Sequence, residues 1–556
     1  MKASYIFITL LFPFVLLAQK KAETVNKSTR PKLVVGLVVD QMRWDYLYRY
    51  ADRYGKGGFN RLLQEGFSCE NAYISYIPTY TACGHASTYT GSVPAINGIT
   101  GNNWIEQQSG YNMYCTEDTT VQTVGSTSKA GQMSPRNLLT STLGDELKLA
   151  TNFRSKVVGI ALKDRGGILP AGHSANAAYW FDDLTGGWIT STYYMGDLPN
   201  WVKAFNDQKL VQNYLTQTWN TLYPIDTYLQ STKDDSPYEG KFRGEKAPVF
   251  PHDIPRIKGA NFNSIRNTPF ANTLTLDFAK QAIVGEQMGQ DNITDLLAVS
   301  LSSTDYLGHQ FGPNSIEIED TYLRLDKDLE DFFNYLDAKI GKDNYTFFLT
   351  ADHGGAHNPN FLLDNKIPAG YWDVKTPTKE LNAKIEAKYK VKGLVRSIFN
   401  YQVNFNYKLI EEHQINLEDL KKDCISILEK QPGVSFVVDL AKVNESPVPE
   451  LLREKIINGH NRKRSGEIVI ILDPAWFQGS GLTGTTHGTW NPYDTHVPMV
   501  FMGWGINKGQ VLNRHTSMSD ITPTISALLK IQEPNGSIGK PVSEALLNSV
   551  TALKKR

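Results

Sequence analysis

Continuous apolar runs of strand length recur along the chain, and most of them end at polar or charged side chains. They span residues 33–39, 157–162, 296–301, 347–350, 468–472 and 500–502. Runs without alternation of apolar and polar positions predict strands that are buried on both faces, as in a parallel sheet. Asp40, Lys163 and Asp352 each come shortly after one of these runs. Because reactive groups of open α/β sheets collect at the carboxyl ends of the strands, these side chains are candidates for an active site.

Helical patterns separate several of the runs. Apolar residues at intervals of three and four extend from Tyr322 to Ile340, with Asp, Lys and Glu between them, and predict an amphipathic helix. Residues 521–529, with Pro523 near the start, predict another helix. Alternating strands and helices predict an α/β fold: a doubly wound, mostly parallel central sheet with helices on both faces.

Two segments interrupt this alternation. Residues 171–270 are rich in Tyr, Trp, Gly, Asp and Pro, and residues 360–465 carry charged helical patterns. We expect both to be large insertions over the active-site edge of one catalytic domain that spans residues 31–545.

The N-terminus has the layout of a secretory signal peptide. Lys2 is followed by an almost wholly apolar stretch over residues 5–17, and Ala18 precedes a polar segment. This pattern predicts a signal peptide over residues 1–18, with cleavage after Ala18. The apolar stretch is short for a membrane span. We therefore expect a periplasmic or secreted protein, with no membrane span in the mature chain.

Composition narrows the range of partners. The 556 residues include 57 basic and 57 acidic side chains, so the formal net charge is zero. Such a balance does not provide the broad positive field of a nucleic-acid-binding protein. We expect small-molecule substrates, no nucleic-acid partner and a monomer. The chain has four cysteines. Export permits a disulfide, and Cys69 and Cys115 could pair, but the sequence leaves this pairing open.

Candidate chemistry lies in short polar motifs. The stretch PTYTACGHAS at residues 78–87 holds hydroxyl and thiol groups, which are poor nucleophiles unless a base or a metal ion activates them. Carboxylate and imidazole groups elsewhere are suitable ligands for zinc. The candidates are Asp40, Asp305, His309, Asp352, His353 and His487. Three aspartates and three histidines can hold two ions.

Taken in order, these motifs resemble a known superfamily. They are Asp40, PTYT at 78–81, DYLGHQFGP at 305–313, ADHG at 351–354 and HG at 487–488. Their order and separations are similar to those of the alkaline phosphatase superfamily, especially its phosphodiesterase/pyrophosphatase branch and the PafA-like alkaline phosphatases. The resemblance covers residues 33–545. It implies an exported phosphate monoesterase that uses two Zn²⁺ ions and releases inorganic phosphate.

The resemblance also implies a role for each motif residue. Thr81, the second threonine of the PTxT motif, is the implied nucleophile and forms a phosphothreonine. The ion that contacts Thr81 is implied to be held by Asp40, Asp352 and His353. The second ion is implied to be held by Asp305, His309 and His487. Two such ions, about 3.5–4 Å apart, clamp the attacking and departing oxygens of an in-line displacement.

Three further residues decide the class of ester. In the PafA-like enzymes a Lys-x-Arg pair contacts the substrate phosphate, and Lys163 and Arg165 match it. Asn102 resembles the family's phosphate-contacting asparagine, with Asn103 as a near competitor. Because a monoester dianion carries more negative charge than a diester, extra cationic donors favour monoesters.

Other functions remain open at this point. A phosphodiesterase or nucleotide pyrophosphatase of the same superfamily is the main alternative, with the aromatic segment 171–270 as an apolar wall for a second ester group. A sulfatase would need a Cys/Ser-x-Pro-x-Arg motif, and the residues after Cys83 lack both the proline and the arginine. An exported binding protein with a structural metal site belongs to a different class. Residue identity favours zinc but leaves manganese and iron open.

Overall fold

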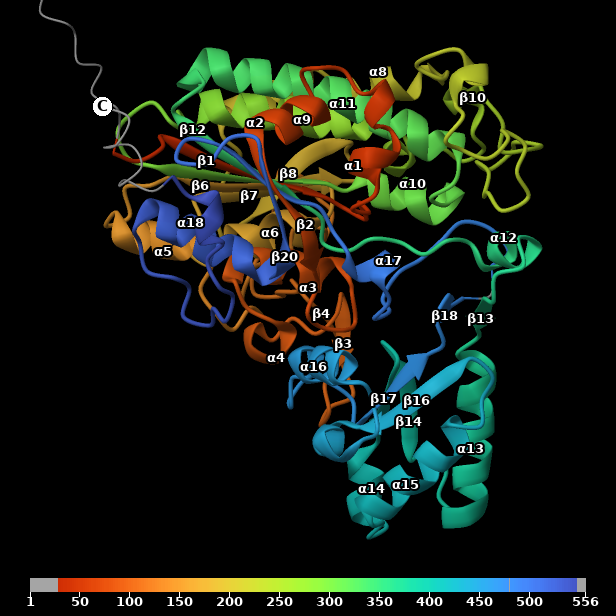
Figure 1. Cartoon of the computed structure of the whole chain (residues 1–556). Helices are drawn as coiled ribbons and strands as arrows, with labels where there is room; N and C mark the ends of the chain where they lie inside the picture. Colours follow the sequence, from red (N-terminus) through yellow and green to blue (C-terminus); the bar gives the residue numbers. More distant parts are fainter. Residues whose placement is uncertain (1–28, 480, 548–556) are drawn as a thin grey trace, which may run out of the picture.

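A ten-stranded sheet forms the centre of the molecule, which is a computed structural model that describes residues 29–479 and 481–547 (Figure 1). The strand order is β20-β2-β19-β12-β1-β11-β6-β7-β8-β5. In that order the strands span Gln510–Ser517, Gly66–Tyr73, Met499–Gly503, Tyr345–Thr350, Leu33–Val39, Asp295–Leu301, Val157–Ala161, Ala177–Asp182, Gly187–Ser191 and Thr123–Val124. The predicted signal peptide, residues 1–18, lies outside the described residues.

The middle of the sheet is parallel, as predicted. Strand β1 pairs in parallel with β11 and β12, and β6 pairs in parallel with β11 and β7. Every residue of β1 is buried, because helices cover both faces of the sheet. Helices α9 (Phe270–Gly285) and α11 (Ile316–Leu336) lie on one face, and α5 (Leu143–Ala150), α6 (Asp164–Ala171) and α18 (Ile521–Leu529) lie on the other (Figure 1). Both predicted helices are confirmed, as α11 and α18.

The segment 171–270 is only partly an insertion. Its residues 177–191 form β7 and β8 of the central sheet, because β7 extends the parallel ladder from β6. The remainder includes α7 (Asn200–Asp207) and α8 (Leu210–Leu215), and its aromatic side chains join the main core. Trp188 and Trp219 are at most 1% exposed. These two tryptophans therefore do not form the exposed apolar wall that a diesterase would need.

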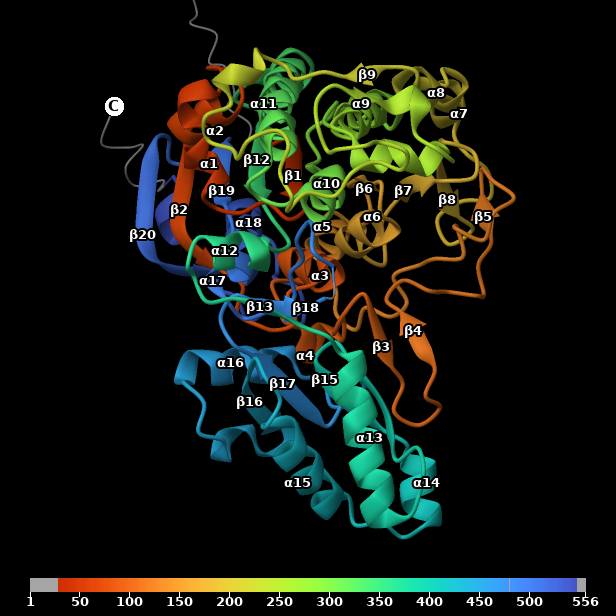
Figure 2. The same cartoon turned by 90° about the vertical axis from the view of Figure 1, so that its right-hand side faces the viewer.

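The second segment forms a small domain with its own sheet and core (Figure 2). Its sheet has the order β14-β15-β17-β16, with strands at Val395–Phe399, Gln402–Phe405, Ile468–Leu472 and Val434–Asp439. All three pairings are antiparallel. Helices α13 (Lys375–Tyr389), α15 (Leu417–Leu428) and α16 (Glu450–Gly459) pack around it.

The apolar run 468–472 corrects one expectation. It is β17 of the small domain, and the assignment of this run to the parallel sheet was wrong. The run lacks polar alternation because both faces of β17 are covered. Ile468 and Ile470 pack into one core, whereas Val469 and Ile471 pack into another that includes α16 residues.

The four cysteines are free and buried, so the considered Cys69–Cys115 disulfide is not formed. Cys69 lies in β2 within the main core, and Cys115 packs in a separate cluster with Ala82 and Trp104. Across the described part of the chain, no helix combines the length and apolar character that a membrane crossing requires.

Candidate active site

The candidate residues follow adjacent strands of the sheet and lie at one edge of it. Asp40 comes directly after β1, Lys163 comes after β6 with one residue between, and Asp352 comes after β12 with one residue between. Asp305 and His309 lie on α10 (Ser303–Phe311), which begins just after β11. Because β12, β1, β11 and β6 are neighbours and run in parallel, their carboxyl ends open at the same edge of the sheet.

The first group is a buried triad of Asp40, Asp352 and His353, each 0% exposed. His353 Nε2 lies 3.6 Å from Asp40 Oδ1 and 3.4 Å from Asp352 Oδ2. Neither of these two carboxylate oxygens has a hydrogen-bond partner among the described residues. Burial, together with the neighbouring Asp352 carboxylate, raises the pKa of Asp40 well above its usual range. Orphaned, buried oxygens beside an imidazole nitrogen fit a bound cation.

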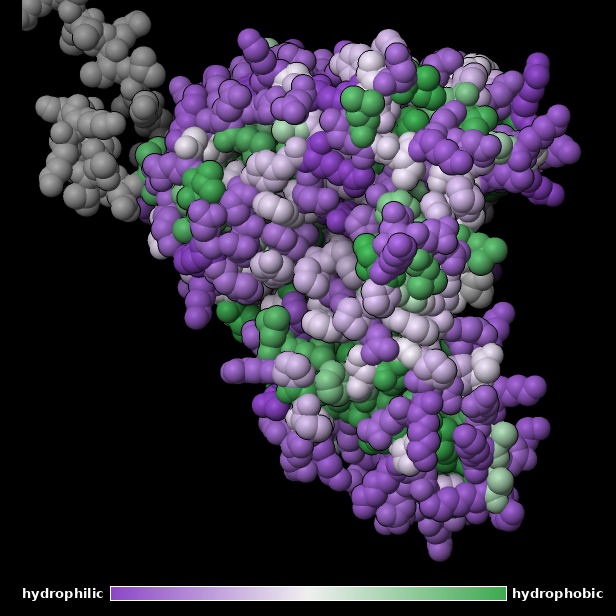
Figure 3. Space-filling view, turned by 45° about the vertical axis from the view of Figure 1, so that its right-hand side comes forward, coloured by the Kyte–Doolittle hydropathy of each residue, from purple (hydrophilic) through white to green (hydrophobic). Residues whose placement is uncertain are grey.

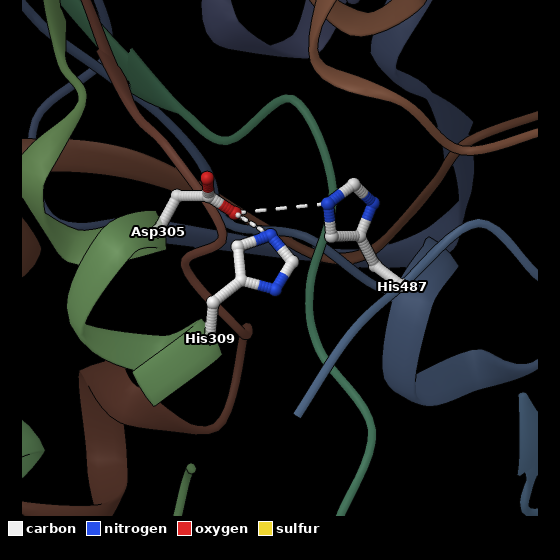
Figure 4. Close-up of side chains that lie close together, drawn as sticks. All are labelled: Asp305, His309 and His487. Carbon is white, nitrogen blue, oxygen red and sulfur yellow. Dashed lines mark ion pairs between the residues drawn. The ribbon is translucent and has the colours of Figure 1, made fainter. Parts of the chain in front are cut away.

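The second group is a more open triad of Asp305, His309 and His487, whose side chains point toward one another (Figure 4). Asp305 and His309 are four residues apart on α10 and so share one helix face. Asp305 Oδ1 lies 3.1 Å from His309 Nε2 and 3.6 Å from His487 Nε2. His487 comes from the loop before α17 (Pro492–Thr495), and the side chain of His309 is 38% exposed.

All three histidines are oriented in the same way. Their Nδ1 atoms contact backbone carbonyl oxygens: His309 that of Thr485 at 2.9 Å, His353 that of Gly354 at 2.9 Å, and His487 that of Thr79 at 2.7 Å. A carbonyl only accepts, so each Nδ1 carries a proton and each Nε2 faces the site. Burial alone would lower the pKa of His309, but the Asp305 carboxylate raises it. Burial lowers the pKa of His353 and of His487, which keeps both rings neutral. This is the pattern of metal-ligating histidines.

Thr81 lies at the first residue of α3 (Thr81–Thr90), beside the buried triad. Its Oγ1 is 3.4 Å from His353 Nε2, and the residue is 1% exposed. The backbone N–H of Ala82 donates to Asn102 Oδ1 at 3.0 Å, which places the Asn102 side chain next to Thr81 at the helix N-terminus. Its competitor Asn103 belongs to β3 (Asn103–Ile105) and accepts a hydrogen bond from the small domain through its carbonyl.

Lys163 connects the two triads. Its Nζ donates to Asp40 Oδ2 at 2.6 Å and to Asp305 Oδ2 at 2.5 Å. Burial alone would lower its pKa, but these carboxylates raise it above the usual range, so the side chain is a cation. Arg165 is the second residue of α6, and its Nη1 donates to the Tyr114 hydroxyl at 3.1 Å. The Nε of Arg165 has no hydrogen-bond partner within the described part of the chain.

Two residues outside the predicted ligand set hold the site together. Gln41 comes directly after Asp40 and contacts both triads. His85 lies one turn after Thr81, with Nδ1 2.8 Å from the Thr81 carbonyl and Nε2 2.8 Å from Ser300 Oγ. The position of His85 inside the PTYTACGHAS stretch was a usable signal. Gln41 had none, because a glutamine after a strand is unremarkable in sequence.

The residues present fit two cations, with the Thr81 hydroxyl beside the buried triad. Two sets of three candidate ligands each lie close enough together to hold an ion, and their imidazole rings are held in place by backbone carbonyls. A divalent metal ion, when bound, would supply the positive charge that favours an ionised hydroxyl and offsets the charge of phosphate oxygens. The protein's own residues orient Thr81, fix the histidine tautomers and place Lys163 between the triads.

A small apolar cavity lies where the main body meets the small domain. Its lining includes Ile77, Pro78, Val469, Ile471 and Trp490. Hydrophobic residues gather between the main body and the small domain in Figure 3. The sequence did not predict this apolar junction between the main body and the small domain.

Comparisons with known proteins find relatives that match this chain over most of its length. Residues 34–496 match the family described as "Type I phosphodiesterase / nucleotide pyrophosphatase". A protein of Myroides odoratus named calcium-transporting ATPase is 60% identical over 539 residues, which cover 96% of this chain and 97% of the relative. Alkaline phosphatase PhoV of Synechococcus elongatus is 55% identical over 535 residues, 95% of this chain and 96% of PhoV.

A solved structure shares the fold throughout. The crystal structure of wild-type alkaline phosphatase PafA matches with a TM-score of 0.91 and 52% identity. The match covers 93% of this chain and 99% of that one. Agreement at this level extends to the central sheet and to the small domain.

Proposed function

Because this chain belongs to the type I phosphodiesterase/nucleotide pyrophosphatase family and is a phosphate monoesterase of the alkaline phosphatase type, we propose that it acts through two zinc ions and a phosphothreonine at Thr81. Thr81 attacks the phosphorus and expels an alcohol, and water then releases inorganic phosphate. The proposed ligands of one ion are Asp40, Asp352 and His353, with Thr81. The proposed ligands of the other are Asp305, His309 and His487.

The convergence of the two triads beside Thr81 supports this proposal most strongly. The Thr81 hydroxyl lies 3.4 Å from a ligand nitrogen of the buried triad. Thr81 is also the first residue of α3, and the first backbone N–H groups of a helix favour an anion such as phosphate. A nucleophile, cationic centres and anion-binding amides in one place are what phosphoryl transfer needs.

A preference for monoesters follows from the proposed phosphate contacts. Lys163, Arg165 and Asn102 all lie near the N-termini of α6 or α3, and we assign the phosphate oxygens to them. The extra terminal oxygen of a monoester gains most from such donors. A diester lacks this extra terminal oxygen, so we expect weaker phosphodiesterase activity.

The proposal also includes the localisation and the oligomeric state of the protein. We propose a periplasmic or secreted monomer, processed after Ala18. The substrates are small phosphate monoesters. The name of the Myroides odoratus relative adds ATP as a substrate to test, because its terminal phosphate carries a similar charge.

The test compares an aryl phosphate, a bis-aryl phosphate diester and ATP as substrates. Enzyme prepared with zinc should hydrolyse the monoester fastest, and a chelator should abolish turnover until zinc is restored. The T81A variant should lose activity and acquire no phosphate in acid-quenched, mass-analysed peptides covering residues 78–87. A T81A variant with wild-type turnover, or a phosphate found on another residue, contradicts the assignment.

A further inference from the structure

Gln41 is held in an unusual conformation between the two triads. Its φ is 63°, in the left-handed region that non-glycine residues rarely occupy, and the residue is only 5% exposed. Such conformations persist where surrounding contacts compensate for their cost. The contacts of Gln41 are therefore informative about what it does.

Those contacts join one aspartate from each triad. The backbone N–H of Gln41 donates to Asp352 Oδ1 at 3.1 Å. Its side-chain Nε2 donates to Asp305 Oδ1 at 2.6 Å, the same oxygen that faces His309 and His487. The other oxygen of Asp305 accepts from Lys163. Asp305 is thus held from both sides, and one of the two donors is the Gln41 amide.

Two glycines make room for this side chain. A Cβ at Gly308 would lie 1.9 Å from Gln41 Oε1, and a Cβ at Gly355 would lie 3.1 Å from it. Gly308 lies on α10 between Asp305 and His309. The glycine of the DxxGH motif therefore has a physical role: a side chain there would displace the Gln41 amide.

We propose that Gln41 is a positioning residue that couples the two metal triads, its backbone orienting Asp352 and its side chain orienting Asp305. This inference rests on the proposed two-zinc function. A hydrogen bond to one carboxylate oxygen fixes the direction of its remaining lone pair, which is how groups outside the ligand set tune a metal site.

The test uses the full-length, zinc-loaded enzyme and the variants Q41G and Q41A. Glycine adopts the left-handed conformation without strain and keeps the N–H that bonds Asp352, so Q41G removes the side chain with its amide but not the backbone hydrogen bond. We expect Q41G to retain the wild-type melting temperature while one of its two zinc ions transfers to a chromophoric chelator about 10- to 100-fold faster. Q41A should show the same zinc loss with a lower melting temperature, because alanine retains the backbone cost.

The matched control is Q402A. Gln402 is also a buried glutamine, but its Oε1 accepts from the backbone N–H of Gly466 in the small domain and not from a group of either triad. It should lose zinc at the wild-type rate. Zinc release from Q41G at the wild-type rate would overturn the proposal. If wild-type enzyme holds no zinc at all, the proposed function fails instead, and the two failures are distinguishable.

A second variant tests the role of the motif glycine. G308A should accelerate zinc loss as Q41G does, because its Cβ collides with the Gln41 side chain. In the double variant Q41G/G308A that collision is gone, and the zinc-release rate should equal that of Q41G alone. If the double variant instead released zinc faster than Q41G, by the factor that G308A causes alone, Gly308 and Gln41 would act independently. That result would contradict the coupling.

Discussion

The two triads have the same kinds of side chain but are built differently. Asp40 and Asp352 extend from the ends of neighbouring strands, and with His353 they are fully buried. The other triad depends on α10 and on a loop more than 170 residues away in sequence, and its His309 side chain is 38% exposed. The sheet alone thus defines one site, whereas the other forms only when a helix and a loop dock. We therefore expect the first triad to hold its ion more firmly.

The largest expected effect comes from removing one ligand of each triad. D352N should lower kcat/KM for an aryl phosphate by on the order of 10³-fold or more, because it disables the ion next to Thr81. H309A should cost less, since water can occupy a partly exposed position. Steady-state kinetics and zinc content per chain measure both, with the exposed His413 changed to alanine as a control. A greater loss in H309A than in D352N would reverse the comparison.

Chelation gives a more direct comparison of the two sites. A limiting chelator should remove one zinc ion from the wild-type enzyme roughly tenfold or more faster than the other, because one triad is open to solvent. H309A should lack the fast phase of zinc release, and this result would assign the fast phase to the open triad. Single-phase release of both ions, or a missing slow phase in H309A, would contradict the difference in burial.

Lys163 tests what links the triads. K163A removes the cation between Asp40 and Asp305 and a proposed phosphate contact. Its kcat/KM should fall about 10²- to 10³-fold on the monoester and less than about tenfold on the diester, which has less charge to stabilise. K156A, at the opposite end of β6, is the control. Equal losses on both esters would mean that Lys163 acts on the metal triads rather than on the substrate.

The smallest expected effect concerns the support of α10. His252 packs 5.5 Å, ring to ring, from Phe311 at the end of α10, and its nitrogens contact Glu245 at 2.9 Å and Glu317 at 3.1 Å. Burial alone would lower the pKa of His252, but these carboxylates raise it to about 9.

A raised folded-state pKa gives stability that is complete below about pH 6.5 and is lost as the pH rises through about 9. The loss should be on the order of 1–3 kcal/mol, and the open triad should release zinc faster above pH 9. H252F should flatten this alkaline decline in melts recorded from pH 7 to 10. A decline of the same size in H252F and wild type would exclude His252 as its source.

Features that depend on a single strand or motif were predictable from the sequence, whereas features that depend on tertiary contacts were less so. Asp40 and Asp352 were predictable because polar residues at the ends of buried strands share one sheet edge. The run 468–472 was misassigned because burial on both faces does not reveal which sheet a strand joins. Residues 177–191 looked like part of an insertion because an aromatic and glycine-rich composition obscured two strands. The role of Gln41 could not be predicted from the sequence, because it depends on a left-handed backbone conformation and on contacts with residues far along the chain.

The absence of any cross-link among Cys69, Cys83, Cys115 and Cys424 has a practical consequence. A fold whose thiols are all reduced and packed in its interior needs no oxidative maturation. Recombinant production of the mature chain in a reducing bacterial cytosol should therefore give native protein, and the supply of metal becomes the step that controls the yield of active enzyme.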